Sequence, residues 1–397
     1  MNFEWLIIGG GIQGSTLASF LLQSNRTTIS NIGIVDPHPT PLNTWKRCTK
    51  TIEMPFLRSP SVHHLALDPF GLDKYAKLPA NRGFAQFTEP YDRPSLALFN
   101  KHCQDLFREI NLQQAWIQDR AIRVKKHRQN WQVSLASGQE LHSHKVVLAL
   151  GLSEQPFWPE WAKEIRNQGG NIHHIFEPTM TQAIDSMSLK SPSSIAIIGG
   201  GISAAHTAIK FSKLYPGKVT LLTRHPIRVH QFDSDPGWLG PKNMSAFSKN
   251  KNIASRRQII IEARHRGSMP KDLRFALLKA EREGALKIIE AEVLSSIQQK
   301  DFITLSLTRD DQLVVDHVIL ATGFKTNAPG MDWLQSTIKE EELICSSCGY
   351  PIANPKTLEW TPNLYVLGAL AELEIGPVSR NIAGARRGAE RIISSVI

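Results

Sequence analysis

The sequence contains little of what would mark a secreted or membrane-spanning protein. Its four cysteines, Cys48, Cys103, Cys345 and Cys348, are too few in 397 residues for a disulfide framework. No uncharged apolar run reaches about 18 residues, so no transmembrane helix is predicted. Residues 6–22 are moderately apolar, but no basic stretch precedes them, and we expect no signal peptide. The sequence therefore predicts a cytoplasmic protein without a membrane partner.

Metal-ligand clusters are also missing. Cys345 and Cys348 have the C-x-x-C spacing, but a structural metal site needs two more ligands, and Cys48 and Cys103 lack a matching pair. We therefore predict no metal. A loop with two free thiols is favoured over a redox pair at this position, and the sequence does not assign these thiols a role.

Acidic residues are the minority charge. Lysine and arginine number 46 and aspartate and glutamate 36, which gives a net charge of +10 and favours anionic partners. No zinc-finger, RNP or helix-turn-helix signature is present, so no nucleic-acid partner is predicted. Residues 242–282 are especially basic. A solvated face is one interpretation of this segment, and a guide for cofactor phosphates or a docking patch is the other.

What the sequence does contain is one unit in two copies. Residues 6–18 read LIIGGGIQGSTLA, and residues 196–208 read AIIGGGISAAHTA. In each copy a short apolar run predicts a strand, the glycines predict a turn, and the following apolar-rich segment predicts a helix. This order is the dinucleotide-binding fingerprint, in which a pyrophosphate lies at the helix N-terminus.

The spacing of the small residues explains the fingerprint. Gly9 permits the tight turn, Gly11 lets the backbone approach a pyrophosphate, and Gly14 lets the helix pack closely on its strand. In the second copy the corresponding residues are Gly199, Gly201 and Ala204, and the fingerprint allows alanine at the third place.

The end of the next strand predicts which dinucleotide each copy binds. Residues 32–35 run into Asp36, whose carboxylate accepts a hydrogen bond from a ribose 2′-hydroxyl and repels a 2′-phosphate, which suits FAD. Residues 219–222 run into Thr223 and Arg224, and an arginine pairs with a 2′-phosphate, which suits NADPH. The alternative for Arg224 is an ordinary surface arginine.

A second repeated pattern predicts how the two units are connected. Residues 131–135 and 145–151, and again residues 302–307 and 317–323, predict a small strand meander that ends in a strand of the dinucleotide-binding sheet. We therefore predict an α/β fold with two Rossmann-like domains, the NADPH domain inserted in the FAD domain. The predicted bounds are 1–160 and 320–397 for the FAD domain, 190–319 for the NADPH domain, and 161–189 for a connection.

With these motifs the sequence resembles class B flavin monooxygenases, and most closely their N-hydroxylating branch, the lysine and ornithine hydroxylases. The similar segments are Asp316-x-x-x-Leu320-Ala321-Thr322-Gly323-Phe324, residues 54–58 (MPFLR), 93–96, 362–368 and 381–386. The resemblance implies cofactor contacts by Thr322, Gly323 and Gly368. It also implies that Met54 and Arg58 lie near the flavin ring, where they are the candidates for an otherwise unknown catalytic site.

The resemblance further implies a reaction. An FAD- and NADPH-dependent monooxygenase of this kind uses molecular oxygen to hydroxylate a small nucleophilic nitrogen or sulfur substrate through a flavin hydroperoxide. Arg58 stands where a substrate-contacting lysine is usual, Phe324 replaces a tyrosine, and residues 250–275 lack the usual Asn-Tyr pair. Free ornithine and lysine are therefore predicted to be poor substrates.

Two other functions fit the same scaffold. One is an NADPH oxidase or flavin reductase, and the other is a flavin-bearing sensor without turnover. Several further residues have both a functional and a structural interpretation. His63 and His64 could lie near the flavin or serve the local fold, Trp45 could cover the flavin ring or pack in the core, and residues 233–237 could form a lid or an ordinary loop. The oligomeric state is not assigned.

Overall fold

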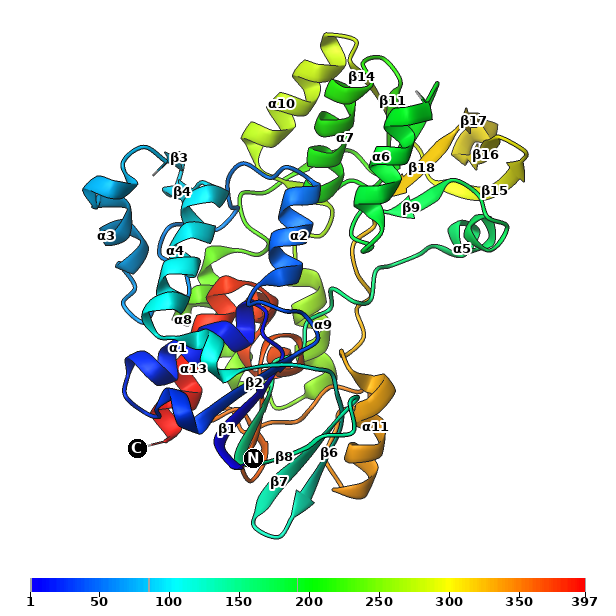
Figure 1. Cartoon of the computed structure of the whole chain (residues 1–397). Helices are drawn as coiled ribbons and strands as arrows, with labels where there is room; N and C mark the ends of the chain where they lie inside the picture. The colour runs from blue at the N-terminus through cyan, green and yellow to red at the C-terminus, as the bar shows by residue number, and fades with distance from the viewer. Residues whose placement is uncertain (1, 85, 191, 397) are drawn as a thin grey trace.

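Each glycine-rich segment lies between a parallel strand and a helix in the computed structural model, which describes residues 2–84, 86–190 and 192–396. The first unit is built on β1 (Asn2–Ile8), α1 (Ile12–Gln23) and β2 (Ile32–Asp36). The second is built on β10 (Ile195–Ile198), α7 (Ile202–Leu214) and β11 (Val219–Thr223). The predicted strand–turn–helix–strand order is thus confirmed in both copies, and the two units form the two lobes of Figure 1.

The first sheet has the strand order β19-β20-β8-β1-β2-β5, with the hairpin β6–β7 attached to β8. Its middle strands are buried on both faces over residues 5–8 of β1 and 32–35 of β2, and these stretches contain no polar side chain. Its other strands are β5 (Trp116–Gln118), β6 (Ala121–His127), β7 (Asn130–Leu135), β8 (Glu140–Leu148), β19 (Glu359–Thr361) and β20 (Leu364–Val366).

Strand β8 begins five residues earlier than the apolar run at residue 145 predicts. Its first half, with alternating burial, pairs antiparallel with β7, while residues 142–148 pair parallel with β1. The same strand therefore ends the predicted meander and enters the central sheet. The second meander, from β15 (Val293–Gln299) to β17 (Gln312–Val315), precedes β18 (His317–Leu320), which pairs parallel with β10 in the same way.

The second sheet has the order β14-β11-β10-β18-β9. Its remaining strands and the strands of its meander are β9 (Ile172–His174), β14 (Leu286–Glu290), β15 (Val293–Gln299), β16 (Phe302–Leu307), β17 (Gln312–Val315) and β18 (His317–Leu320). The short pairs are β3 (Phe87–Thr88) with β4 (Arg93–Pro94), and β12 (Arg228–Val229) with β13 (Ser268–Met269).

The segment that we predicted as a connection, 161–189, is more than a connection. It contains most of α5 (Glu160–Asn167), all of β9 and most of α6 (Met180–Lys190), and β9 is an edge strand of the second sheet. Because Ile165 and Ile172 are buried in a core of the second unit, the segment folds as part of that unit. We therefore propose that the second unit begins near residue 156, where Pro156 forms a bridge with Phe324 and the two crossings between the units meet.

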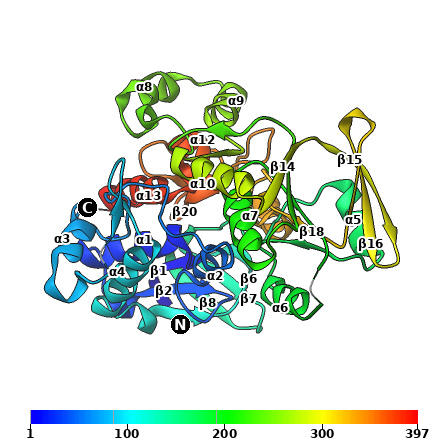
Figure 2. The same ribbon diagram turned by 90° about the horizontal axis from the view of Figure 1, so that it is seen from above.

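A second departure concerns α8 (Pro241–Lys249) and α9 (Ile253–Ala263). They belong to the inserted segment, but Trp238, Met244, Phe247 and Ile260 are buried in the core of the first unit. Both helices lie beside α12 and α13 in Figures 1 and 2. The bounds of the other helices are α2 (Asn43–Thr51), α3 (Gly71–Lys77), α4 (Leu96–Glu109), α10 (Lys271–Arg282), α11 (Met331–Glu340), α12 (Glu372–Ile375) and α13 (Ile382–Ser395).

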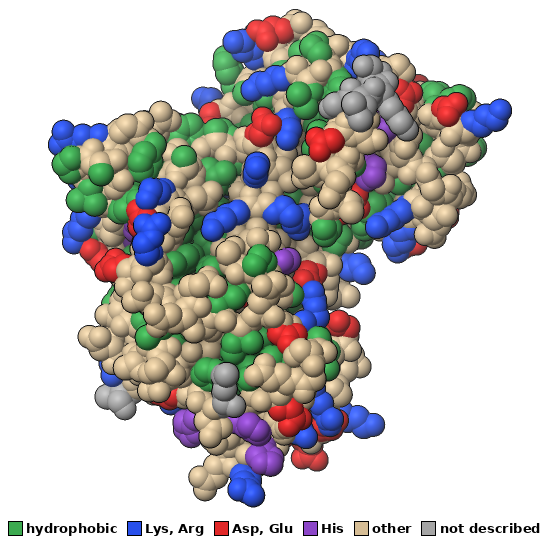
Figure 3. All heavy atoms as spheres, viewed as in Figure 1, with side chains coloured by type: hydrophobic (Ala, Val, Ile, Leu, Met, Phe, Trp, Pro, Cys, Tyr) green, Lys and Arg blue, Asp and Glu red, His purple; other side chains and the backbone are tan. Residues whose placement is uncertain are grey.

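Basic side chains tie the two units together. Arg47 on α2 donates to the carbonyl oxygen of Phe176 at 2.7 Å, and Lys210 on α7 donates to that of Thr51 at 3.0 Å. Buried Arg93 pairs with Asp272 at the start of α10, at 2.9 Å. Lysine and arginine side chains gather over the junction of the lobes in Figure 3. None of the described helices is long and apolar enough to span a bilayer.

His64 and His102 of α4 form a buried pair beside α3. The ring centroids lie 5.2 Å apart, and the backbone N–H of Ala66 donates to Nδ1 of His64 at 3.2 Å. Burial and the neighbouring His102 lower the pKa of His64 to about 3, and burial lowers the pKa of His102 to about 4. The structural interpretation of His64 therefore fits its surroundings.

Acid should destabilise the protein through these imidazoles. Their pKa values in the folded chain lie below the unfolded value of 6.5, so their contribution to stability is present above pH 6.5 and is lost as the pH falls toward 4. Linkage gives a loss of about 2 kcal/mol per imidazole at pH 5. His102→Leu should flatten the fall of Tm between pH 7 and 5, whereas replacing exposed His144 by leucine should not. Equal slopes for the wild type and both variants would contradict this assignment.

Candidate functional site

The first glycine-rich loop is shaped by close backbone contacts. Gly9 has φ +108°, and a Cβ there would lie 2.6 Å from the carbonyl oxygen of Ala149 on the neighbouring crossing. A Cβ at Gly14 would overlap the carbonyl oxygen of Gly9, so the helix lies as close to the strand as the spacing predicts. A Cβ at Gly11 would meet nothing within 4 Å. Open space thus lies in front of Gly11, where the fingerprint places a pyrophosphate.

The N-terminus of α1 is free to face an anion. No side chain caps it, and no acidic residue lies in its first turn. Gln13 in that turn donates through Nε2 to the carbonyl oxygens of Ser379 at 3.1 Å and Asn381 at 3.3 Å. Gly368, with φ +61°, packs against Gln13 so closely that a Cβ would lie 2.8 Å from its Cγ. The end of β20 and the start of α13 therefore meet the first glycine-rich loop.

Asp36 lies at the end of β2, as predicted. Its carboxylate accepts hydrogen bonds from the backbone N–H groups of Gly10 at 2.7 Å and His38 at 2.9 Å. These bonds fix the carboxylate beside the glycine-rich loop. A carboxylate accepts more than two hydrogen bonds, so Asp36 keeps acceptor capacity for a ribose hydroxyl. The ribose contact itself stays a prediction.

The second glycine-rich loop repeats the tight turn. Gly199 has φ +149°, a Cβ there would lie 2.5 Å from the carbonyl oxygen of Ala321, and Ala204 is buried at the third position. Arg224, the residue that follows β11, is exposed, and its side chain makes no hydrogen bond or ion pair with any residue that the structure describes. Its guanidinium is therefore available for a 2′-phosphate.

The residues around the predicted L-A-T-G-F segment make contacts where the chain passes from one unit to the other. The carboxylate of Asp316 accepts hydrogen bonds from Ser193 and Ser194 before β10. The hydroxyl of Thr322 donates to the carbonyl oxygen of Phe157 at 2.5 Å, and the carbonyl oxygen of Gly323 accepts from Phe157 N–H at 2.9 Å. These contacts hold the two crossings together, and direct cofactor contacts by Thr322 and Gly323 stay predictions.

Met54 and Arg58 lie between the units. Met54 is partly buried and packs against the cores of both. The guanidinium of Arg58 donates to the carbonyl oxygens of His230, Gln231 and Phe232, pairs with Asp233 at 2.6 Å, and donates to Ser268 Oγ. Because its donors are engaged by protein atoms, Arg58 holds residues 230–233, which lead into the segment 233–237 that could form a lid or an ordinary loop. These contacts give no support for direct substrate contact by Arg58.

Both interpretations of the basic segment 242–282 are wrong for three of its arginines. Arg256 pairs with Glu374 at 2.7 Å, and Arg257 and Arg264 both pair with fully buried Glu372, which Arg380 also contacts. Burial and the neighbouring Arg380 and Arg257 lower the pKa of Arg264 from its usual value. These side chains dock α9 on α12. The sequence could not show this, because the acidic partners lie more than 100 positions away.

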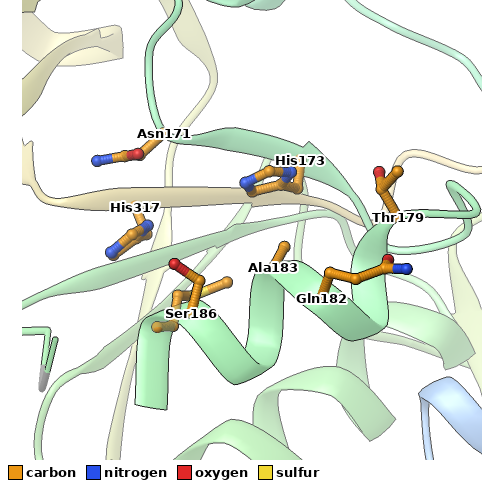
Figure 4. Close-up of a pocket in the computed structure, with 8 residues that line it drawn as sticks. Asn171, His173, Thr179, Gln182, Ala183, Ser186 and His317 are labelled. Carbon is orange, nitrogen blue, oxygen red and sulfur yellow. The ribbon is translucent and has the colours of Figure 1, made fainter. Parts of the chain in front are cut away.

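Two further features lie away from the glycine-rich loops. Cys345 is partly buried and Cys348 is exposed, and both are free thiols. A cavity of about 290 Å³ lies between α6 and the edge of the second sheet, lined by Asn171, His173, Gln182 and His317 among others (Figure 4). Within the described residues no group of three or more histidine, cysteine, aspartate or glutamate side chains could hold a metal ion.

Two Rossmann-like units, one inserted in the other and each with a glycine-rich loop between a parallel strand and a helix, define the class of two-dinucleotide oxidoreductases. The sequence profile of the pyridine nucleotide-disulphide oxidoreductase family matches residues 3–379, and the chain belongs to this family.

Solved structures show how widely the fold is shared. An ornithine N-hydroxylase from Kutzneria sp. 744 is 14% identical with a TM-score of 0.77, over 100% of this chain and 99% of that chain. A bacillithiol disulfide reductase from Staphylococcus aureus is 15% identical with a TM-score of 0.63, over 100% of this chain and 98% of that chain. At such identities the likeness establishes the fold alone.

One curated relative also matches. The ferroptosis suppressor protein 1 of Taeniopygia guttata is 24% identical over 261 residues, which are 65% of this chain and 57% of that protein. The match therefore spans little more than half of the relative's length, and it establishes no shared activity.

The open space at Gly11 gives a direct test of the first dinucleotide site. Gly11→Val should leave the Tm of the flavin-free protein unchanged, because its side chain meets no protein atom within 4 Å at Cβ, but should yield protein that loses flavin on dilution. Gly14→Val should lose flavin and also lower Tm, because the side chain overlaps Gly9. Gly83 is exposed and equally open, so Gly83→Val is the matched control. A fully yellow Gly11→Val protein would refute the placement.

Proposed function

We propose that the protein is an FAD- and NADPH-dependent monooxygenase that hydroxylates a small nucleophilic nitrogen or sulfur compound with molecular oxygen. The observation that carries this proposal is the fold likeness, which is higher for the ornithine N-hydroxylase than for the disulfide reductase over the same full length. The described cysteines support it, because Cys48, Cys103, Cys345 and Cys348 are all free thiols and form no redox disulfide. Their free thiols also support a reducing, cytoplasmic location.

Both cofactors fit the residues present. The space in front of Gly11 and the fixed Asp36 carboxylate suit FAD, and the available Arg224 suits the 2′-phosphate of NADPH. When bound, the flavin supplies the route by which the electrons of NADPH reach oxygen. The chain itself binds and orients. Gly11 and the N-terminus of α1 admit the pyrophosphate, Arg224 selects the phosphorylated coenzyme, and partly buried Met54 helps to exclude water from the junction of the units.

The contacts of Arg58 bear on the substrate. In the resemblance this position holds a substrate-contacting lysine, whereas here the guanidinium is bound to loop 230–233 and Ser268. Its cationic group is therefore not free to bind the carboxylate of an amino acid. We accordingly propose that free ornithine and free lysine are poor substrates.

An NADPH oxidase or flavin reductase is the second candidate. Membership of the pyridine nucleotide-disulphide oxidoreductase family supports it, because the same two units serve a disulfide reductase in one of the solved structures. The two candidates differ in the fate of oxygen rather than in the binding of the cofactors.

Arg224→Ala should weaken the use of NADPH and leave NADH nearly unaffected. Hydrogen bonds to charged groups contribute about 1.5–3 kcal/mol, so the apparent constant for NADPH should rise roughly tenfold to a hundredfold. Lys218 is an exposed basic residue that precedes the same strand, at the opposite end from Arg224. Lys218→Ala is therefore the matched control. Steady-state kinetics with both coenzymes decide the matter. Equal losses with NADPH and NADH would show that Arg224 does not bind the phosphate.

The proposed reaction predicts a product that is heavier by one oxygen atom. Purified flavin-bound protein should be incubated with NADPH and a panel of amines and thiols, with product mass, peroxide and NADPH consumption followed in parallel. At least one compound should gain oxygen in proportion to the NADPH consumed, and ornithine and lysine should not. Peroxide equal to the NADPH consumed across the whole panel would favour the oxidase. Colourless Gly11→Val protein gives the background.

A further inference from the structure

The two glycine-rich loops differ in what lies in front of them. At Gly11 an added Cβ would meet nothing within 4 Å, whereas at Gly201 it would lie 3.5 Å from Cα of Gly267. Both glycines occupy the position at which the backbone must approach a pyrophosphate. The approach is therefore open in the first unit and narrowed by protein backbone in the second.

We call residues 264–268 the covering loop. It packs tightly on the second glycine-rich loop through His225, whose ring lies against both. A Cβ at Gly200 would lie 3.0 Å from Cε1 of His225, and a Cβ at Gly267 would lie 2.8 Å from its Nε2. Gly267 has φ +65°, a conformation that favours glycine. A Cβ on Gly201 would already be in van der Waals contact with Gly267, at 3.5 Å, and a phosphate group is larger than a methyl group, so it does not fit between these two glycines in this conformation.

Residues of the first unit hold both ends of the covering loop. At one end Arg264 pairs with Glu372 at 2.9 Å and donates to the carbonyl oxygen of Pro377 at 3.1 Å. At the other end Arg58 donates to Ser268 Oγ at 3.0 Å. The covering loop belongs to the second unit by sequence, yet its position is set from the first.

Arg58 also fixes the loop that lies beside the covering loop. Besides Ser268, its guanidinium binds the carbonyl oxygens of residues 230–232 and the carboxylate of Asp233. The backbone N–H of His265 donates in turn to the carbonyl oxygen of Asp233 at 2.8 Å. Arg58 thereby holds the covering loop directly, through Ser268, and indirectly, through residues 230–233.

We propose that the covering loop obstructs the second dinucleotide site in this conformation, and that Arg58 is the positioning residue that keeps it there. Binding of a coenzyme pyrophosphate at Gly201 then requires Gly267 to move away, at the expense of the contacts made by Arg58 and Arg264. Because Glu372 and Pro377 precede α13, whose N-terminal segment contacts Gln13, coenzyme binding is coupled to the first dinucleotide site. This inference rests on the proposed function for the identity of the coenzyme.

The test measures binding rather than turnover. Isothermal titration of purified flavin-bound protein with NADP⁺ gives Kd, and hydrogen exchange of the free protein reports the opening of residues 264–268. Arg58→Gln removes the guanidinium group that holds the covering loop. NADP⁺ should therefore bind about fivefold more tightly, which is the equivalent of one lost hydrogen bond. Exchange within residues 264–268 should be faster by a similar factor. Ser268→Ala removes one contact of the same set and should act in the same direction.

Lys210→Gln is the matched control. Lys210 also ties the units together, through Thr51 and Glu53, but it touches neither the covering loop nor residues 230–233. Its loss should leave both the Kd for NADP⁺ and the exchange of residues 264–268 unchanged.

The outcomes separate the two proposals. Equal or weaker NADP⁺ binding by Arg58→Gln and Ser268→Ala, with exchange of residues 264–268 unchanged, would overturn the obstruction and leave the coenzyme assignment intact. If the wild type and all variants failed to bind NADP⁺, the assignment of the second site to NADPH would fall, and the obstruction with it. Tighter binding by Lys210→Gln as well would show a general loosening of the units and would equally count against a specific role for Arg58.

Discussion

The arrangement of the two units depends most on the ion pairs that the buried carboxylate of Glu372 forms. It is fully buried and pairs with Arg257 and Arg264 of the inserted segment and with Arg380 of its own unit. An isolated buried charge costs several kcal/mol, so removal of any partner leaves an expensive group behind. Helix α9 and the covering loop are therefore held on the first unit by electrostatics, whereas Trp238, Met244 and Phe247 hold the same segment by apolar packing.

This anchoring connects the inserted unit with the first dinucleotide site through one segment of the first unit. Residues 372–381 accept the arginines of the insert on one side and receive the Gln13 side chain on the other. The segment between β20 and α13 thus touches both the helix that follows the first glycine-rich loop and the loop that lies over the second. A change at either dinucleotide site has a short path of direct contacts to the other.

The scaffold and the reaction are determined at different levels. Glycines at fixed spacings and buried parallel strands specify two dinucleotide sites, and an oxygenase and a reductase share that architecture. The reaction depends on what lies at the junction of the units, where Met54 packs against both cores and Arg58 is bound by backbone carbonyls. In this chain the junction is arginine-rich, and Cys48 of α2, which packs there against the core of the second unit, is a free thiol.

The sequence by itself determined the local units. The two G-x-G-x-x-(G/A) segments, the strands that follow them and the two meanders were predictable because strand, turn and helix each follow from neighbouring residues, and the insertion followed from their order. Only the tertiary structure decided that 161–189 supplies an edge strand, that α8 and α9 belong to the core of the first unit, and that Arg58 and Arg264 hold the covering loop. These contacts join positions from 100 to more than 200 residues apart, and no local periodicity encodes which buried charge pairs with which.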